Sequence, residues 1–140
     1  MPAMAWSSRR GLQVAVALAG IVPVGAGLAG VLIGARMADG AAGGIVAGLS
    51  LDSHVRYLSG LLLAIGLAFW SLIPAIERRC AAFRLLTAIV VVGGIARLAG
   101  LGLAGVPSTP MQLALVMELV VTPLLCLWQV RVADATIGRR

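Results

Sequence analysis

Residues 93–120 read GGIARLAGLGLAGVPSTPMQLALVMELV, and this stretch decides the fold that the sequence predicts. Apolar runs lie on both sides of GVPSTP, residues 105–110, where a glycine and two prolines interrupt a helix. So short a connection makes the two flanking helices antiparallel neighbours. Within this stretch each helix carries a single charge, Arg97 before the turn and Glu118 after it.

These two charges lie at matching distances from arginines near the far ends of their helices. Arg97 follows Arg84 by thirteen residues and Glu118 precedes Arg131 by thirteen, which is about 20 Å at a rise of about 1.5 Å per residue. A lone charge near the middle of a bilayer costs roughly 3 kcal/mol or more, so opposite charges at one depth are expected to pair. The sequence therefore predicts an intramembrane Arg97–Glu118 ion pair as the first candidate functional site.

The composition is that of a membrane protein. Of the 140 residues, 61% are hydrophobic and only 11% are charged, and the mean hydropathy is +1.06. A water-soluble domain of this length needs a charged surface that so few ionisable side chains cannot provide. We therefore expect one all-α integral membrane domain over residues 1–140, with four transmembrane helices in an up-down-up-down bundle. The predicted spans are residues 11–35, 54–76, 83–105 and 110–132.

Local signals set the predicted ends of the second and fourth spans. Asp52 or Ser53 is expected to be the N-cap of the second, which should end near Pro74. Thr109 is expected to cap the fourth, with Gln112 completing a capping box three residues later. Farther along, Pro123 removes a backbone hydrogen bond and predicts a kink just beyond Glu118.

The arginines predict the orientation, because cytoplasmic ends of membrane helices carry an excess of positive charge. Eight arginines fall on one side of the predicted bundle and two, Arg36 and Arg56, on the other. This predicts a multi-pass protein of the bacterial cytoplasmic (inner) membrane with both termini in the cytoplasm. The eight are Arg9, Arg10, Arg78, Arg79, Arg84, Arg131, Arg139 and Arg140.

No catalytic or metal-binding motif can be assembled from the sequence. His54 is the single histidine, and Cys80 and Cys126 are interpreted as packing residues. We expect no catalytic residue, metal, cofactor or nucleic-acid partner. Small residues recur at spacings of four, which favours close packing inside the bundle over a dimer interface, although a protein partner or a homo-oligomer stays open. These small-residue faces are Ala26, Gly30 and Gly34; Gly60, Ala64 and Ala68; and Ala96, Gly100 and Ala104.

Polar residues at the predicted outer ends of three helices form a candidate pocket open to the periplasmic face. One interpretation is structural: the Arg97–Glu118 pair fixes the helix register and Arg56 contacts lipid phosphates. The other is a site for an anionic headgroup or small acid, because the cationic side chains in this set outnumber the carboxylates. The candidate ligand or ion-pair pocket comprises Asp52, His54, Arg56, Tyr57, Arg97, Gln112 and Glu118.

Three segments resemble a family of small bacterial membrane proteins, domain of unknown function 4345. They are SHVRYLSGLLLAIGL at 53–67, GGIARLAGLGLAGVP at 93–107 and ELVVTPLLCLWQ at 118–129. The resemblance implies a four-helix architecture and carries no established activity. The matching positions are His54, Arg56, Tyr57, Gly60, Gly94, Arg97, Glu118, Pro123 and Trp128.

Three functions are compatible with these features. The absence of a catalytic set in the sequence favours a non-enzymatic accessory or structural subunit of the membrane. The alternative is a binder or carrier of a small anionic or lipidic molecule in the outer-leaflet pocket. A membrane enzyme working through His54 and Glu118 is least favoured, because the two residues lie at different predicted depths.

Overall fold

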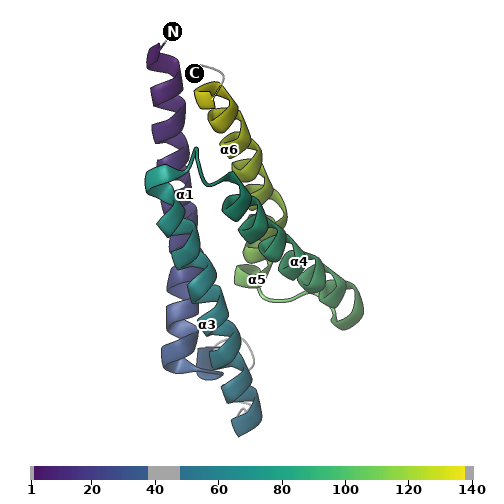
Figure 1. The fold of residues 1–140 in the computed structure, drawn as a ribbon. Coiled ribbons are helices and arrows are strands. Elements are labelled where there is room, and N and C mark those ends of the chain that lie inside the picture. Colours follow the sequence, from purple (N-terminus) through teal and green to yellow (C-terminus); the bar gives the residue numbers. More distant parts are fainter. Residues whose placement is uncertain (1, 38–47, 138–140) are drawn as a thin grey trace. The chain divides into compact units, whose positions relative to one another are not determined.

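The computed structural model describes residues 2–37 and 48–137, and the side chains of residues 8–37 and 48–136. Every regular element in this part of the chain is a helix (Figure 1). Helices α5, η2 and α6 follow one another without a break, and η2 is a π-helix. The elements are α1 (Pro2–Ile33), α3 (Leu49–Leu72), the 3-10 helix η1 (Ile73–Ala75), α4 (Cys80–Ala104), α5 (Thr109–Val116), η2 (Met117–Val121) and α6 (Thr122–Ile137).

Among the described residues, four helical stretches are long and apolar enough to cross a membrane, which is the number of helices that the sequence predicts. They are Ser8–Ile33, Leu49–Ala75, Cys80–Ala104 and Thr109–Thr136. The shortest has 25 residues, more than the roughly 20 that a bilayer core of about 30 Å requires. In the apolar 18-residue segment of each stretch few residues are buried, from 6% in the last stretch to 22% in the first. Many of their large apolar side chains are exposed, among them Leu18, Leu32, Leu85, Val92 and Leu113.

The predicted start of the second span at Asp52 or Ser53 is wrong, because α3 begins at Leu49. The carbonyl oxygen of Gly48 accepts hydrogen bonds from the N–H groups of Leu51 and Asp52, so the first turn is already closed there. The Asp52 carboxylate accepts the N–H of Ala35, two residues after the end of α1, and Arg56 Nε of its own helix. The predicted end near Pro74 is confirmed, since α3 gives way to η1 after Leu72.

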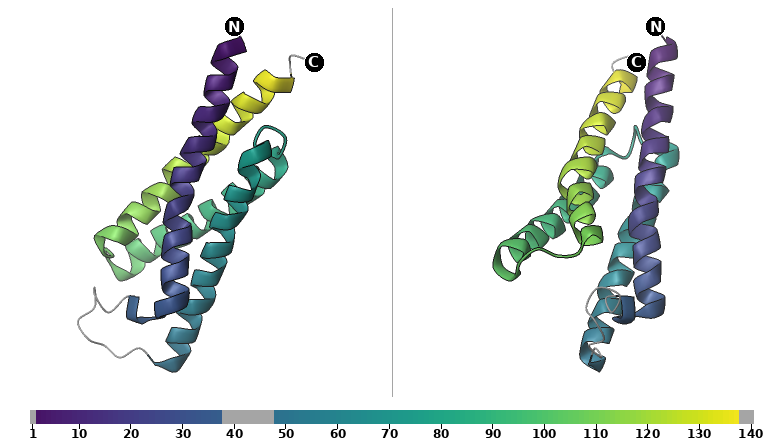
Figure 2. Two further views of the ribbon diagram at one scale, coloured as in Figure 1. Left: turned by 90° about the vertical axis from the view of Figure 1, so that its left-hand side faces the viewer. Right: turned by 180° about the vertical axis from the view of Figure 1, so that it is seen from behind.

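The structure consists of two packing units, and each is described by itself. One unit is Leu18–Trp70, and the other combines Met1–Ala17 with Ser71–Arg140. In the first, the end of α1 and most of α3 are antiparallel neighbours, and in the second α4 and α6 are (Figure 2). The up-down-up-down order of the whole bundle stays a prediction, as does the side of a membrane on which each end lies.

In the unit Leu18–Trp70, glycines let α1 and α3 approach backbone to backbone. A Cβ added to Gly27 would lie 2.8 Å from both the Cα of Leu63 and the carbonyl oxygen of Ser59. Gly30, from one of the predicted small-residue faces, packs against the Ser59 side chain. For this helix pair the small residues serve packing inside the chain.

In the other unit, apolar side chains from three stretches of the chain form a core beside the segment that links α3 to α4. Pro74 ends regular hydrogen bonding there and leaves backbone carbonyl groups that need donors. Polar side chains from the neighbouring helices satisfy them, as described below. The buried apolar residues of this unit are Leu12, Val16, Leu72, Ile76, Phe83, Val132 and Ala133.

Candidate functional site

Arg97 of α4 and Glu118 of η2 form the ion pair that the sequence predicts. Arg97 Nε donates to Glu118 Oε2 at 3.0 Å, and Nη2 donates to Oε1 at 3.1 Å. Such a two-pronged contact fixes the direction of both side chains and is stronger than a single charged hydrogen bond. The Arg97 side chain remains 34% exposed and that of Glu118 18%, so the pair is only partly enclosed.

A local widening of the fourth helical stretch carries Glu118. Pro123 has no N–H to donate, and the five residues Met117–Val121, which end two positions before it, form the π-helix η2. Met117 O accepts the backbone N–H of Thr122 and also its Oγ1 hydroxyl, at 2.8 Å. Gly94, one turn before Arg97, leaves room for this wider turn: a Cβ there would lie 2.9 Å from the Cβ of Glu118.

The capping box predicted at Thr109 is wrong. Helix α5 takes Ser108 as its N-cap, one residue earlier, and that side chain makes no capping hydrogen bond. Gln112 Nε2 instead donates to the carbonyl oxygen of Pro107 at 2.9 Å. Gln112 therefore braces the connection between α4 and α5.

Beside the ion pair, a groove of about 290 Å³ extends from Arg97 to the connection after α4. Arg97 is the single charged residue in its lining, and Arg97 Nη1 approaches the Sδ atom of Met111 at 3.0 Å. The lining residues are Arg97, Gly100, Leu101, Ala104, Gly105, Pro107 and Met111.

Asp52 and Arg56 form a second cluster, in the unit Leu18–Trp70, that closes the hairpin between α1 and α3. Asp52 Oδ1 accepts the N–H of Ala35 at 2.9 Å, and Oδ2 accepts Arg56 Nε at 2.7 Å. Arg56 Nη1 donates to the carbonyl oxygens of Val31 and Leu32, at 2.6 and 3.3 Å. A helix end leaves such carbonyls unpaired and favours positive charge, so these contacts satisfy the end of α1. We call the set of hydrogen bonds that Asp52 and Arg56 make here the polar clasp.

Gly34 makes the polar clasp possible. Its φ of +66° turns the chain out of α1 in a left-handed conformation that L side chains rarely adopt. Gly34 N–H donates to Gly30 O at 2.9 Å, which completes the helix end. A Cβ at Gly34 would overlap the Asp52 carboxylate.

The seven residues predicted as one pocket thus divide between the two units. Asp52 and Arg56 meet in one unit, and Arg97 and Glu118 meet in the other. His54 and Tyr57 are exposed on α3, Tyr57 at 64%. Their convergence with the ion pair stays a prediction. Each of the two arginines in this set has a carboxylate partner, Asp52 for Arg56 and Glu118 for Arg97.

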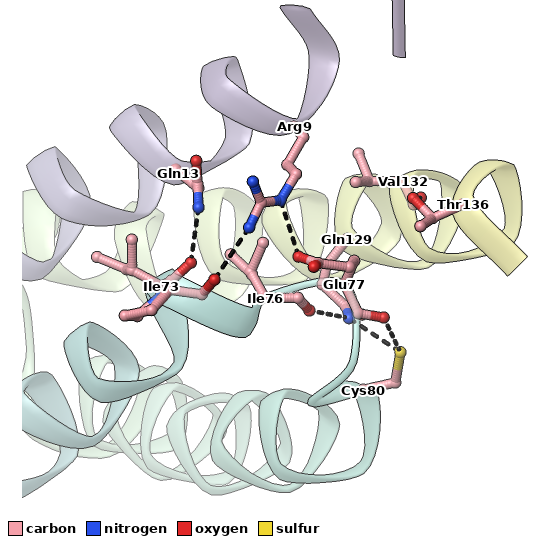
Figure 3. A network of polar contacts seen from close by, with 10 residues as sticks. Arg9, Gln13, Ile73, Ile76, Glu77, Cys80, Gln129, Val132 and Thr136 are labelled. Carbon is pink, nitrogen blue, oxygen red and sulfur yellow. Dashed lines mark hydrogen bonds and ion pairs between the residues drawn. The ribbon is translucent and has the colours of Figure 1, made fainter. Parts of the chain in front are cut away.

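Sequence reasoning missed a polar network around η1 (Figure 3). Arg9 donates to Glu77 Oε2 and to Pro74 O, each at 2.9 Å. Gln13 Nε2 donates to Ile73 O at 2.8 Å, which supplies a second donor for the carbonyls left open where the helix ends. Two sequence features could have indicated this network. Gln13 and Gln129 are polar residues inside apolar helices, and Pro74 marks a helix end whose carbonyl groups need donors.

Gln129 of α6 completes this network from the opposite side. Its side chain is fully buried, and Nε2 donates to Ile76 O at 2.8 Å and contacts Cys80 Sγ at 3.0 Å. Its Oε1 is buried without a hydrogen-bond partner among the described residues. Cys80 in turn contacts the carbonyl oxygen of Glu77 through its thiol, at 3.6 Å, so this cysteine packs within the network.

The electrostatics of Glu77 follow from its position in this network. Burial disfavours its charged form, but a hydrogen bond from its own backbone, one from Arg9 and the positive charges of Arg9 and Arg78 together outweigh burial. The pKa of Glu77 is therefore held below its usual value. Among the residues with described side chains, no group of three or more His, Cys, Asp or Glu lies close enough to bind a metal ion.

The sequence model of the family described as Domain of unknown function (DUF4345) matches residues 11–129. The chain belongs to this family. The DUF4345 region contains both the polar clasp and the Arg97–Glu118 pair, whereas Arg9 precedes it. Comparison with curated proteins and with solved structures gives no match.

Proposed function

We propose that this DUF4345 protein is a small multi-pass protein of the bacterial inner membrane, with both termini in the cytoplasm, that acts as a non-enzymatic accessory or structural subunit. Four apolar helices with few buried residues support the membrane location, since so much exposed apolar surface is unfavourable in water. The arginine distribution supports the orientation. Lipid is the expected surrounding, and a larger membrane complex the expected context.

The observation that carries the structural role is the two-pronged Arg97–Glu118 contact. It joins α4 to the π-helix at a single register, and pairing of opposite charges is the arrangement that makes two ionised side chains tolerable in an apolar helix pair. No described histidine, cysteine or hydroxyl side chain is hydrogen-bonded to either partner. The pair therefore resembles a lock between helices more than an acid–base site.

Extraction of the protein directly into native lipid discs, followed by mass spectrometry of the intact assembly, tests the accessory role. A protein partner in fixed stoichiometry is the expected result, and a matched preparation of an unrelated small four-helix membrane protein controls for adventitious capture. A chain that emerges alone under conditions that preserve known complexes of the same membrane contradicts the accessory role.

A second function, binding of a small anionic or lipidic molecule, is supported by the groove beside Arg97. If this is the function, replacing Arg97 and Glu118 together by apolar residues should abolish binding and leave the fold intact. A double variant that still binds rejects it.

A further inference from the structure

The N–H groups of the Arg97 guanidinium are only partly satisfied by hydrogen-bond acceptors. An arginine side chain has five N–H donors. Two are directed to the Glu118 oxygens and a third to the thioether sulfur of Met111, which is a weak acceptor. Two N–H groups are left without an acceptor among the described residues. Leaving a donor without an acceptor in an apolar setting is unfavourable, so the two remaining N–H groups favour binding of an oxygen atom from another molecule.

The groove supplies space for that oxygen beside the guanidinium. Its remaining lining is apolar side chains and glycines, so Arg97 is the one charge that a bound molecule would meet there. Ligand pockets generally measure about 300–1,000 Å³. At about 290 Å³ the groove holds a headgroup and the first methylene groups of a chain, and it is too small for a whole two-chain lipid.

The remaining N–H donors of Arg97 decide the kind of headgroup. Glu118 already neutralises Arg97, so an anion in the groove shares the guanidinium with a carboxylate on its other edge. An oxyanion with two oxygens matches the two free N–H groups, as carboxylates and phosphates do in paired contacts with arginine. A cationic headgroup finds no partner in the lining.

From these contacts we infer that the groove binds the oxyanion head of an amphiphile, a carboxylate or phosphate attached to an apolar chain, with Arg97 as its anchor. The apolar chain of the bound amphiphile leaves the groove over Leu101 and Ala104 toward lipid. This inference rests on the proposed membrane location and names the ligand class for the second candidate function.

The two open glycines of α4 provide a test that leaves both charges untouched. A Cβ added to Gly100 or to Gly93 meets nothing within 4 Å, but only Gly100 lines the groove. Gly100→Leu should therefore fill the groove, while Gly93→Leu is its matched control on the same helix. The full chain is purified in dodecyl maltoside, which carries no oxyanion, and binding of radiolabelled oleate is measured by equilibrium dialysis.

We expect wild type and Gly93→Leu to bind oleate equally and Gly100→Leu to bind at least tenfold more weakly. Glu118→Gln should bind more tightly than wild type, because Arg97 then loses a competing carboxylate. Oleyl alcohol, which has the chain without the oxyanion, should not compete. Equal binding by Gly100→Leu and Gly93→Leu, or equal competition by oleyl alcohol, overturns the inference.

Competition by phosphatidylglycerol identifies the source of the headgroup: displacement of oleate shows that a lipid phosphate is accepted, and failure to displace it restricts the site to carboxylates. Both outcomes support the shared chemistry. Alkaline extraction of cell membranes tests the location separately. A chain that stays in the membrane but binds no oleate rejects the ligand alone, whereas a chain released by the extraction rejects the membrane location.

Discussion

At the scale of single residues, three arginine side chains are each paired with a carboxylate. Arg9, Arg56 and Arg97 each have a carboxylate partner within 3.0 Å. Arg9 and Arg56 also donate to carbonyl oxygens at helix ends, so their charges stabilise backbone as well as carboxylates. Arg97 is different, because its third contact is a sulfur atom.

The Arg97–Glu118 pair predicts a strong difference between single and double substitution. Breaking a fully buried pair from one side costs about 3–5 kcal/mol, and partial exposure of Arg97 reduces this to an expected cost of about 2 kcal/mol for Arg97→Gln. The double variant Arg97→Met with Glu118→Leu leaves no unpaired charge and should stay within about 1 kcal/mol of wild type. Thermal unfolding in detergent, followed by circular dichroism, measures both. Equal losses in the single and double variants argue against the lock.

Gly34 predicts a backbone effect at the polar clasp. Gly34→Ala places a Cβ on a left-handed residue and against the Asp52 carboxylate, and the conformational strain alone costs about 1–2 kcal/mol. Gly25→Ala is the control, because a Cβ there meets nothing within 4 Å and helix propensity favours alanine. Unfolding midpoints should fall for Gly34→Ala and hold or rise for Gly25→Ala. The reverse order would show that the clasp has been misassigned.

Glu77 predicts a stability that depends on pH. Because the folded state lowers the pKa of Glu77, its contribution is complete above the ordinary glutamate value, about 4.3, and is lost as pH falls through the folded pKa. Glu77→Gln should therefore lower the unfolding temperature at pH 7 and make little difference at pH 2. A gap between the two proteins that is unchanged between those pH values contradicts the prediction.

At the scale of elements, long apolar runs predict the helices well, and their ends poorly. The four spans follow from hydropathy alone, which needs no knowledge of neighbours. The predicted starts differ from Leu49 and Thr109 because other groups take the expected capping side chains. A distant one, the N–H of Ala35, binds Asp52, and a local one, the carbonyl oxygen of Pro107, binds Gln112. The Arg97–Glu118 contact could be predicted because counting residues from Arg84 and from Arg131 places the two side chains at the same position along neighbouring helices.

The π-helix predicts that Pro123 controls the ion pair from a distance. In Pro123→Ala the restored N–H permits regular α-helical bonding through η2, which removes the wide turn and rotates Glu118 relative to α6. The coupling energy between Arg97 and Glu118, measured by a double-mutant cycle, should then fall by at least half. Pro110→Ala, near the start of α5 and outside the π-helix, is the control and should leave the coupling unchanged. Unchanged coupling in Pro123→Ala shows that η2 does not depend on the proline.

At the scale of the whole molecule, the proposed topology can be tested by chemical labelling in intact cells. In a background where Cys80 and Cys126 are alanine, Ser108→Cys should react with a membrane-impermeant maleimide, because the connection before α5 is expected outside the cytoplasm. Arg78→Cys, in the segment between α3 and α4, should react only after the cells are permeabilised. The opposite pattern assigns the termini to the outer side.

The placement of the polar clasp and the ion pair also bears on how the chain enters a bilayer. Each of these contacts lies within one helical hairpin, one between α1 and α3 and the other between α4 and the α5–η2–α6 stretch. A chain inserted two helices at a time would therefore pair Asp52 with Arg56 first and Arg97 with Glu118 later, each within its own hairpin. If the proposed membrane location is correct, each hairpin could enter the bilayer with these charges already paired, without help from the other hairpin.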